Sequence, residues 1–128
     1  SGIARGKYTK GDVDKLHAHV NADLQGHGGV IDEFYYCVHH PDYGDAKDCA
    51  CRKPKVGMLK QACNDYDIDL DKSWLIGDKL IDIQTGENAC ISTVLVLTGY
   101  GKKSLQMVNS DQSIADDLLD AVCQYIVY

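Results

Sequence analysis

The stretch SWLIGDKLID, residues 73–82, decides the fold of this chain. Its first half, Ser73–Gly77, is a compact apolar run that ends at a glycine and predicts a buried strand. An amphipathic pattern then begins at Leu80 and predicts a helix to about Ala89. Asp78 falls at the junction, which is the carboxyl end of the strand, and in open α/β sheets ligands bind at that end.

The rest of the chain alternates in the same way. Thr9, with Asp12 in the first turn, offers an N-cap for a helix that runs to about Gln25. The further predicted elements are a strand over residues 30–38, a loop over 39–54, a helix over 56–66, a strand over 93–97, a loop over 99–109, and a final helix that Ser113 caps. This order predicts βαβ units, and therefore a Rossmann-like, doubly wound parallel sheet with helices on both faces.

Length and composition exclude several classes of protein. A chain of 128 residues, 45% hydrophobic and 25% charged, is typical of one soluble globular domain. No apolar run approaches the ~20 residues that cross a bilayer, and no signal-peptide core is present, so we expect a cytoplasmic protein without membrane contact. The net charge of −6 disfavours nucleic acid as a partner. The basic residues gather in glycine- and proline-containing junctions, which suits a small anionic ligand.

Two short cysteine motifs predict a metal site. CVHHP, residues 37–41, precedes CAC, residues 49–51, in a chain whose six cysteines are expected to be metal ligands or buried thiols. Cys37, His39, Cys49 and Cys51 supply the donors of a closed, four-coordinate Zn²⁺ site. His39 is preferred to His40 because the spacing of one residue at a strand end puts it on the face of Cys37. The alternative is two unrelated cysteine clusters in a loop.

The charged residues beside these motifs have two interpretations each. Arg52 and Lys53 either offset the negative charge of a three-thiolate zinc site or reach an anionic substrate. Asp78 either holds Mg²⁺, with Lys79 meeting a phosphate, or caps the following helix. We also expect Lys53 and Asp78 to converge on one anion site, because both lie in loops expected at the carboxyl edge of the sheet.

Taken together, these motifs resemble the zinc-containing branch of the haloacid dehalogenase superfamily. The matching stretches, in the order of the family, are SGIARG, YYCVHHP, CACRKPKVGML, LIGDKLID and VLVLTGYG, and they cover most of the chain. Members of this branch remove phosphate from heptose bisphosphates or from histidinol phosphate. The residues of the stretches SGIARGKYT and YYCVHHP favour the heptose bisphosphate members, with histidinol phosphate as the alternative substrate.

The resemblance implies a cytoplasmic, Mg²⁺-dependent phosphatase that removes the 7-phosphate of a heptose bisphosphate through an aspartyl-phosphate. The sugar belongs to the synthesis of lipopolysaccharide precursors. By their matching positions, the resemblance implies that the zinc ligands are Cys37, His39, Cys49 and Cys51. It implies that Lys53 stabilises the phosphoryl group and that Arg52 recognises the substrate. It also implies that Asp78 binds magnesium and that Lys79 and Ser1 make further substrate contacts. Asp82 completes the pattern that begins at Asp78, and we expect it to support the loop.

One departure from the family pattern is serious. The family places its nucleophile and its acid/base aspartate in a DxDGT-type motif after the first strand. The D-x-D spacings of this chain, at Asp12 and in residues 65–71, follow no strand and precede no Gly-Thr. We therefore expect residues 1–128 to be one partial domain, with residues 37–54 as a zinc-binding loop within it.

Residues 1–128 are accordingly expected to turn over no substrate alone. A dimer contact or a partner strand would complete the sheet. The competing hypothesis from another class is a non-catalytic zinc-binding module that contacts phosphate or nucleic acid.

Overall fold

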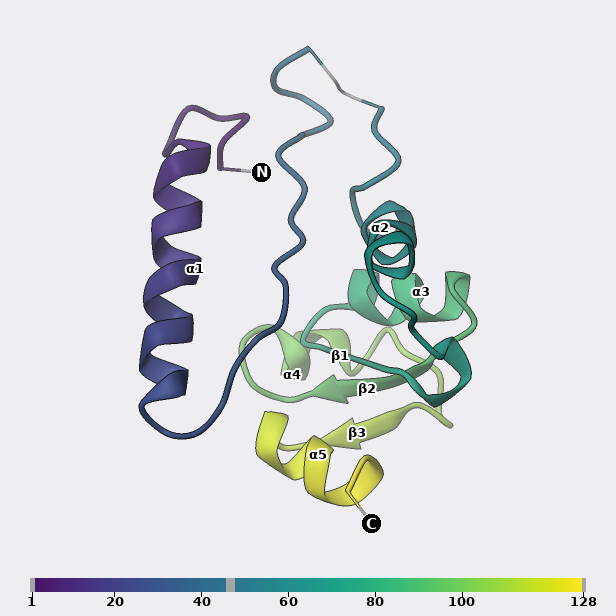
Figure 1. Ribbon diagram of the computed structural model, residues 1–128. Coiled ribbons are helices and arrows are strands. Elements are labelled where there is room, and N and C mark those ends of the chain that lie inside the picture. The colour runs from purple at the N-terminus through teal and green to yellow at the C-terminus, as the bar shows by residue number, and fades with distance from the viewer. Residues whose placement is uncertain (1, 46–47, 128) are drawn as a thin grey trace. The chain divides into compact units, whose positions relative to one another are not determined.

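The structure is a computed structural model that describes residues 2–45 and 48–127. It divides into two compact units, Ser1–Arg52 and Lys53–Tyr128, which are described separately below (Figure 1). The assignment of the whole chain to one partial domain stays a prediction.

The second unit is built on a three-stranded parallel sheet. The strands are β1 (Trp74–Gly77), β2 (Ser92–Val96) and β3 (Ser113–Ala115), in the order β1-β2-β3. Ile76 pairs with Val94 across the first ladder, and Val94 pairs with Ser113 across the second. Val94 is completely buried, which is typical of a central strand in a parallel sheet. The predicted α/β fold with a parallel sheet is therefore confirmed.

Helices and one 3₁₀ turn surround this sheet. They are α2 (Gly57–Asp65), the 3₁₀ turn η1 (Leu70–Lys72), α3 (Leu80–Asn88), α4 (Gly101–Ser104) and α5 (Leu118–Tyr125). α3 packs against β1 and β2, whereas α5 packs against β2 and β3. The helices predicted over residues 56–66 and 80–89 are found within one or two residues of their expected ends. The predicted loop over residues 99–109 contains the single turn of α4.

The prediction that Ser113 caps the last helix is wrong. Ser113 instead begins β3, whose backbone forms the ladder on the edge of β2 opposite β1. The helix α5 begins five residues later, and Asp117 is its N-cap, with a side chain that accepts a hydrogen bond of 2.9 Å from the Asp120 N–H. Hydrogen bonds to β2 satisfy the backbone groups of residues 113–115, so these residues form a strand and not the first turn of a helix.

The first unit contains the helix α1 (Lys10–Gln25), which begins where the sequence predicts. Thr9 and Asp12 form a reciprocal capping box. The Asp12 N–H donates to Thr9 Oγ1 at 3.2 Å, and the Thr9 N–H donates to Asp12 Oδ2 at 2.8 Å. The bond from the Thr9 N–H, and a second bond of 2.7 Å from the Thr9 hydroxyl to the same oxygen, lower the pKa of the Asp12 carboxyl, because they stabilise its charged form.

The strand predicted over residues 30–38 is not formed. This segment is extended but has no strand partner among the residues described, and a lone strand leaves its backbone groups without a ladder. It runs beside α1 (Figure 1), and side-chain contacts hold it there. Asn21 exchanges two hydrogen bonds of 2.8 Å with the Ile31 backbone, and His17 stacks on Phe34 with 4.1 Å between ring centroids. The Tyr36 hydroxyl donates to Asp14 Oδ1 at 2.6 Å.

Candidate functional site

The end of this extended stretch and the loop after it gather the four predicted zinc ligands. The sulfur atoms of Cys37, Cys49 and Cys51 and one ring nitrogen of His39 all lie within 4.8 Å of one another. Cys37 Sγ lies 3.1 Å from Cys51 Sγ and 3.6 Å from Cys49 Sγ. His39 Nδ1 lies 3.3 Å from Cys51 Sγ. Three sulfurs and one imidazole nitrogen around one centre are the donor set of a structural Zn²⁺ site, so this cluster can hold zinc.

The structure separates the two adjacent histidines. His39 belongs to the cluster, whereas the ring of His40 is buried, with Arg5 Nη2 at 2.7 Å from its Nε2. The Asp42 N–H donates to the other ring nitrogen of His40 at 3.1 Å. Burial, followed by the nearby charges of Arg5 and Arg52, lowers the pKa of His40. His40 therefore closes the loop beside the cluster as a neutral side chain.

The thiols of the cluster are strongly unequal. Burial opposes ionisation of Cys49, but hydrogen bonds from Cys51 and Cys37 outweigh it and lower the pKa of Cys49 to about 6. Burial, with hydrogen bonds to Cys37 and Cys49 and the charges of those two thiols, raises the pKa of Cys51 to about 12. Without a cation, these crowded sulfurs thus favour one thiolate over several. A divalent cation is what lets all of them ionise together, which again suits zinc.

Arg52 and Lys53 follow the cluster directly in the sequence, but they belong to different units. In the first unit, Arg52 Nη1 donates to the carbonyl oxygen of His39 at 3.2 Å. The guanidinium is therefore partly engaged by the backbone of a predicted zinc ligand. Lys53 opens the second unit, and its Nζ lies 2.6 Å from Asp82 Oδ1.

Asp82 links Lys53 to the start of α3. Its side chain is only 7% exposed, and its second oxygen accepts the Lys79 N–H at 3.1 Å. This bond caps α3. Capping this helix was one of the two interpretations of Asp78, and the structure shows that Asp82 caps it instead. A side chain at Gly77 would collide with the Asp82 carboxylate, so glycine is required there for the close approach.

Asp78 lies at the carboxyl end of β1, beyond Gly77. Its Oδ2 accepts the Tyr100 N–H at 2.8 Å, and its carbonyl oxygen accepts the buried Ser104 hydroxyl at 3.0 Å. Gly99 has a φ of +56°, and a side chain there would meet the Asp78 carboxylate. Among the described residues, Oδ1 of Asp78 has no hydrogen-bond partner. A carboxylate oxygen left open at a strand end is the hard donor that Mg²⁺ prefers.

Lys79 projects over an aromatic ring that the sequence did not single out. Its Nζ lies 4.3 Å from the centroid of the Tyr100 ring, within the range of a cation–π interaction. Tyr100 thus contacts Asp78 through its backbone and Lys79 through its ring. Its place just after a predicted strand, at the carboxyl edge of a parallel sheet, was the one available signal for this role.

Asp82 thus joins Lys53 to the backbone of Lys79 at the start of α3, and Asp78 directly precedes Lys79 at the carboxyl end of β1. The convergence of Lys53 and Asp78 on one anion site stays a prediction. The predicted contact residue Ser1 lies outside the described residues. Among those described, no helix combines the length and the apolar character needed to cross a membrane.

Known proteins with the same sequence pattern are phosphatases. A protein of Pseudomonas putida, named D-glycero-beta-D-manno-heptose-1,7-bisphosphate 7-phosphatase, is 35% identical over 127 residues, which are 99% of this chain and 70% of that protein. D-glycero-D-manno-heptose-1,7-bisphosphate 7-phosphatase of Chlorobaculum tepidum is 37% identical over 137 aligned positions, covering 99% of this chain and 69% of the relative.

A solved structure agrees with these sequence matches. D,D-heptose 1,7-bisphosphate phosphatase of B. bronchiseptica, crystallised with magnesium and phosphate, superposes with a TM-score of 0.86 at 35% identity. The match covers 97% of this chain and 68% of that one. The class that the fold and these matches define is thus that of phosphate-monoester hydrolases with a HAD-like fold. Residues 50–121 match the HAD-hydrolase-like family model, and the chain belongs to this family.

Proposed function

We propose that this protein removes the 7-phosphate of D-glycero-D-manno-heptose 1,7-bisphosphate, and that its partner is accordingly a small phosphorylated sugar. The observation that carries the proposal is the link from Lys53 through Asp82 to Lys79, beside Asp78 at the carboxyl end of β1. The names of relatives that match 99% of this chain supply the sugar. Six cysteines without a disulfide among them suit a cytoplasmic location, which we also propose.

Each site residue receives a role in this proposal. Asp78 would hold Mg²⁺ through its open oxygen, and the bound ion would supply positive charge to the oxygens of the phosphoryl group. Lys53, oriented by Asp82, stabilises the charge that develops on the transferring group. Lys79 binds a phosphate oxygen from above the Tyr100 ring. The attacking carboxylate of the proposed aspartyl-phosphate is not assigned to any aspartate of this sequence.

The remaining residues recognise substrate or hold the loop. Cys37, His39, Cys49 and Cys51 would hold Zn²⁺ as a closed structural site, because four protein donors leave no position for a reacting water. Arg52 contacts the sugar in this proposal, supported by the family resemblance and by its place next to Lys53 in the sequence. Ser1 as a substrate contact, and a dimer or partner strand completing the sheet, stay predictions.

The proposal is tested by phosphate release from the heptose bisphosphate and from histidinol phosphate, measured in parallel with Mg²⁺. The assay uses the whole protein that the gene encodes, because residues 1–128 alone are expected to turn over no substrate. We expect phosphate release from the sugar. The rate of release should fall about 100-fold or more in Asp78→Asn and in Lys53→Met. Asp67→Asn removes an exposed carboxylate outside the site and should leave the rate unchanged. Preference for histidinol phosphate, or full activity of Asp78→Asn, would contradict the proposal.

A further inference from the structure

One loop holds both the side chain and the backbone of Asp78. The segment 97–104, which leaves the end of β2 and contains α4, lies in the same unit as Asp78. Its Tyr100 N–H donates to Asp78 Oδ2 at 2.8 Å, and its Ser104 hydroxyl donates to the Asp78 carbonyl oxygen at 3.0 Å. These partners follow Asp78 by 22 and 26 positions in the sequence. The first bond orients the carboxylate, and the second fixes the backbone that carries it.

Local structure places Ser104 for this bond. Ser104 ends the single turn of α4, and its N–H donates to the Tyr100 carbonyl oxygen at 3.1 Å. Gly101 lets the turn lie close to β2, because a side chain there would collide with the Val96 carbonyl oxygen. Ser104 is only 3% exposed, and a buried hydroxyl is expected to have its partner within the protein. For Ser104 that partner is the backbone of Asp78.

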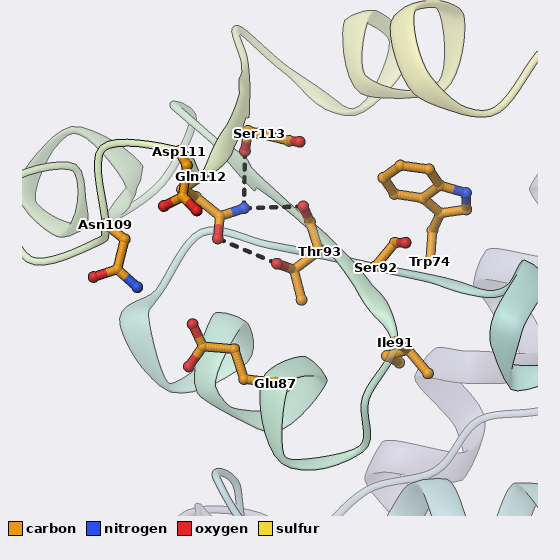
Figure 2. Close-up of a pocket in the computed structure, with 9 residues that line it drawn as sticks. All are labelled: Trp74, Glu87, Ile91, Ser92, Thr93, Asn109, Asp111, Gln112 and Ser113. Carbon is orange, nitrogen blue, oxygen red and sulfur yellow. Dashed lines mark hydrogen bonds between the residues drawn. The ribbon is translucent and has the colours of Figure 1, made fainter.

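The strand that carries this loop is also fixed at its start, at the end of the sheet remote from Asp78. Gln112 Nε2 donates to the carbonyl oxygens of Thr93 and Ser113, at 2.9 and 3.0 Å. The Thr93 hydroxyl donates to Gln112 Oε1 at 3.2 Å, and Figure 2 shows these three bonds joining the starts of β2 and β3. The loop 97–104 therefore departs from an anchored strand.

A carboxylate held in this way suits magnesium. Mg²⁺ requires nearly ideal octahedral geometry from its oxygen ligands, so a ligand that is already oriented binds it better than one that must first be ordered. Residues that hydrogen-bond to a metal ligand commonly change metal affinity by about 10- to 100-fold without contacting the ion. The bonds from Tyr100 and Ser104 hold Asp78 but leave its Oδ1 open.

We propose that Ser104 is a positioning residue for magnesium. Its hydroxyl holds the backbone of Asp78 and thereby keeps Oδ1 in one orientation. Ser104 acts through Asp78 and is not itself a ligand of the ion. This inference rests on the proposed function, in which Asp78 holds Mg²⁺.

Calorimetric titration of the whole protein with Mg²⁺ tests this role. Ser104→Ala removes the hydroxyl, and we expect its affinity for Mg²⁺ to fall about tenfold. Ser104→Cys fills the same space with a much weaker donor and should also lose affinity, which separates the hydrogen bond from the volume of the side chain. Ser110→Ala makes the same chemical change at an exposed serine and should bind Mg²⁺ as the parent does.

Gln112→Ala separates positioning from general destabilisation. It removes three hydrogen bonds at the far end of the sheet. Its midpoint of thermal unfolding should therefore fall, while its affinity for Mg²⁺ stays that of the parent. An equal loss of Mg²⁺ affinity in Gln112→Ala and Ser104→Ala would overturn the inference. Parental affinity in either Ser104 variant would overturn it as well.

Asp78→Asn distinguishes this inference from the proposed function. We expect this variant to lose the Mg²⁺ binding that Ser104→Ala weakens. If Asp78→Asn binds Mg²⁺ as the parent does, Asp78 is not the ligand, and its proposed role falls together with that of Ser104. If Mg²⁺ binding depends on Asp78 but not on Ser104, the proposed function keeps its support and only this inference is overturned.

Discussion

Lys53 Nζ lies 2.6 Å from Asp82 Oδ1, although 29 positions separate the two residues in the sequence. The lysine is partly exposed, whereas the carboxylate is buried and also accepts the Lys79 N–H. One buried acid therefore holds the Lys53 ammonium group and the first turn of α3 together.

Loss of this acid should cost stability as well as phosphate binding. In Asp82→Ala, the Lys79 N–H and Lys53 lose their partner, and we expect the free energy of unfolding to fall by about 1–3 kcal/mol. Denaturant titration followed by Trp74 fluorescence measures the change, because Trp74 lies in the same unit. Asp67→Asn should stay within about 0.5 kcal/mol of the parent. If Asp82→Ala unfolds with the same free energy as the parent, the contacts of Asp82 do not stabilise the fold.

The cysteine cluster predicts one tightly bound zinc ion per chain. Cys49→Ser should abolish zinc binding, since structural zinc contributes about 10–16 kcal/mol of apparent binding free energy in small domains. Elemental analysis of purified protein gives the metal content. Cys123 was expected to be a buried thiol, but the structure exposes it, so Cys123→Ser in the other unit is the matched control, with zinc retained. Zinc-free parent protein, or a Cys49→Ser variant that keeps its zinc, would refute the assignment.

Tyr100 should tune phosphate binding through Lys79. Tyr100→Leu removes the ring beneath the ammonium group, and we expect phosphate affinity in the presence of Mg²⁺ to fall about two- to fivefold. Tyr100→Phe keeps the ring and the backbone N–H that binds Asp78, so it should bind phosphate as the parent does. Calorimetric titration with inorganic phosphate distinguishes them. Equal affinities of the leucine and phenylalanine variants would show that the Tyr100 ring does not contribute to phosphate binding.

Tyr36 should be among the last of the eight tyrosines to ionise. Its hydrogen bond to Asp14 raises the pKa from 10.0 to about 12. Because the pKa is raised in the folded state, the stabilisation is complete below about pH 10 and is lost as the pH rises through about 12. Spectrophotometric titration, with Tyr36→Phe to assign the signal, measures this. Asp14→Asn should lower the pKa toward its usual value, and an unchanged titration would contradict the bond.

The parts of this structure that the sequence predicts are those with local signals. The apolar run before Gly77 predicts β1, and the one-residue spacing of the cysteine motifs predicts the cluster. Residues 30–38 have strand propensity, but propensity does not say whether a partner strand exists, and here α1 is the neighbour. β3 is only three residues long and gives too short a pattern to recognise. The contacts of Asp82 and Tyr100 span 29 and 22 positions, which no local pattern encodes.

The proposed activity is the removal of one particular phosphate from one sugar. Phosphorus NMR of heptose 1,7-bisphosphate, incubated with Mg²⁺ and the protein expressed from its own gene, tests it most directly. We expect the 7-phosphate signal to be replaced by that of inorganic phosphate while the 1-phosphate signal remains, and we expect Lys53→Met to slow this conversion. Loss of the 1-phosphate instead, or a spectrum that does not change, would contradict it.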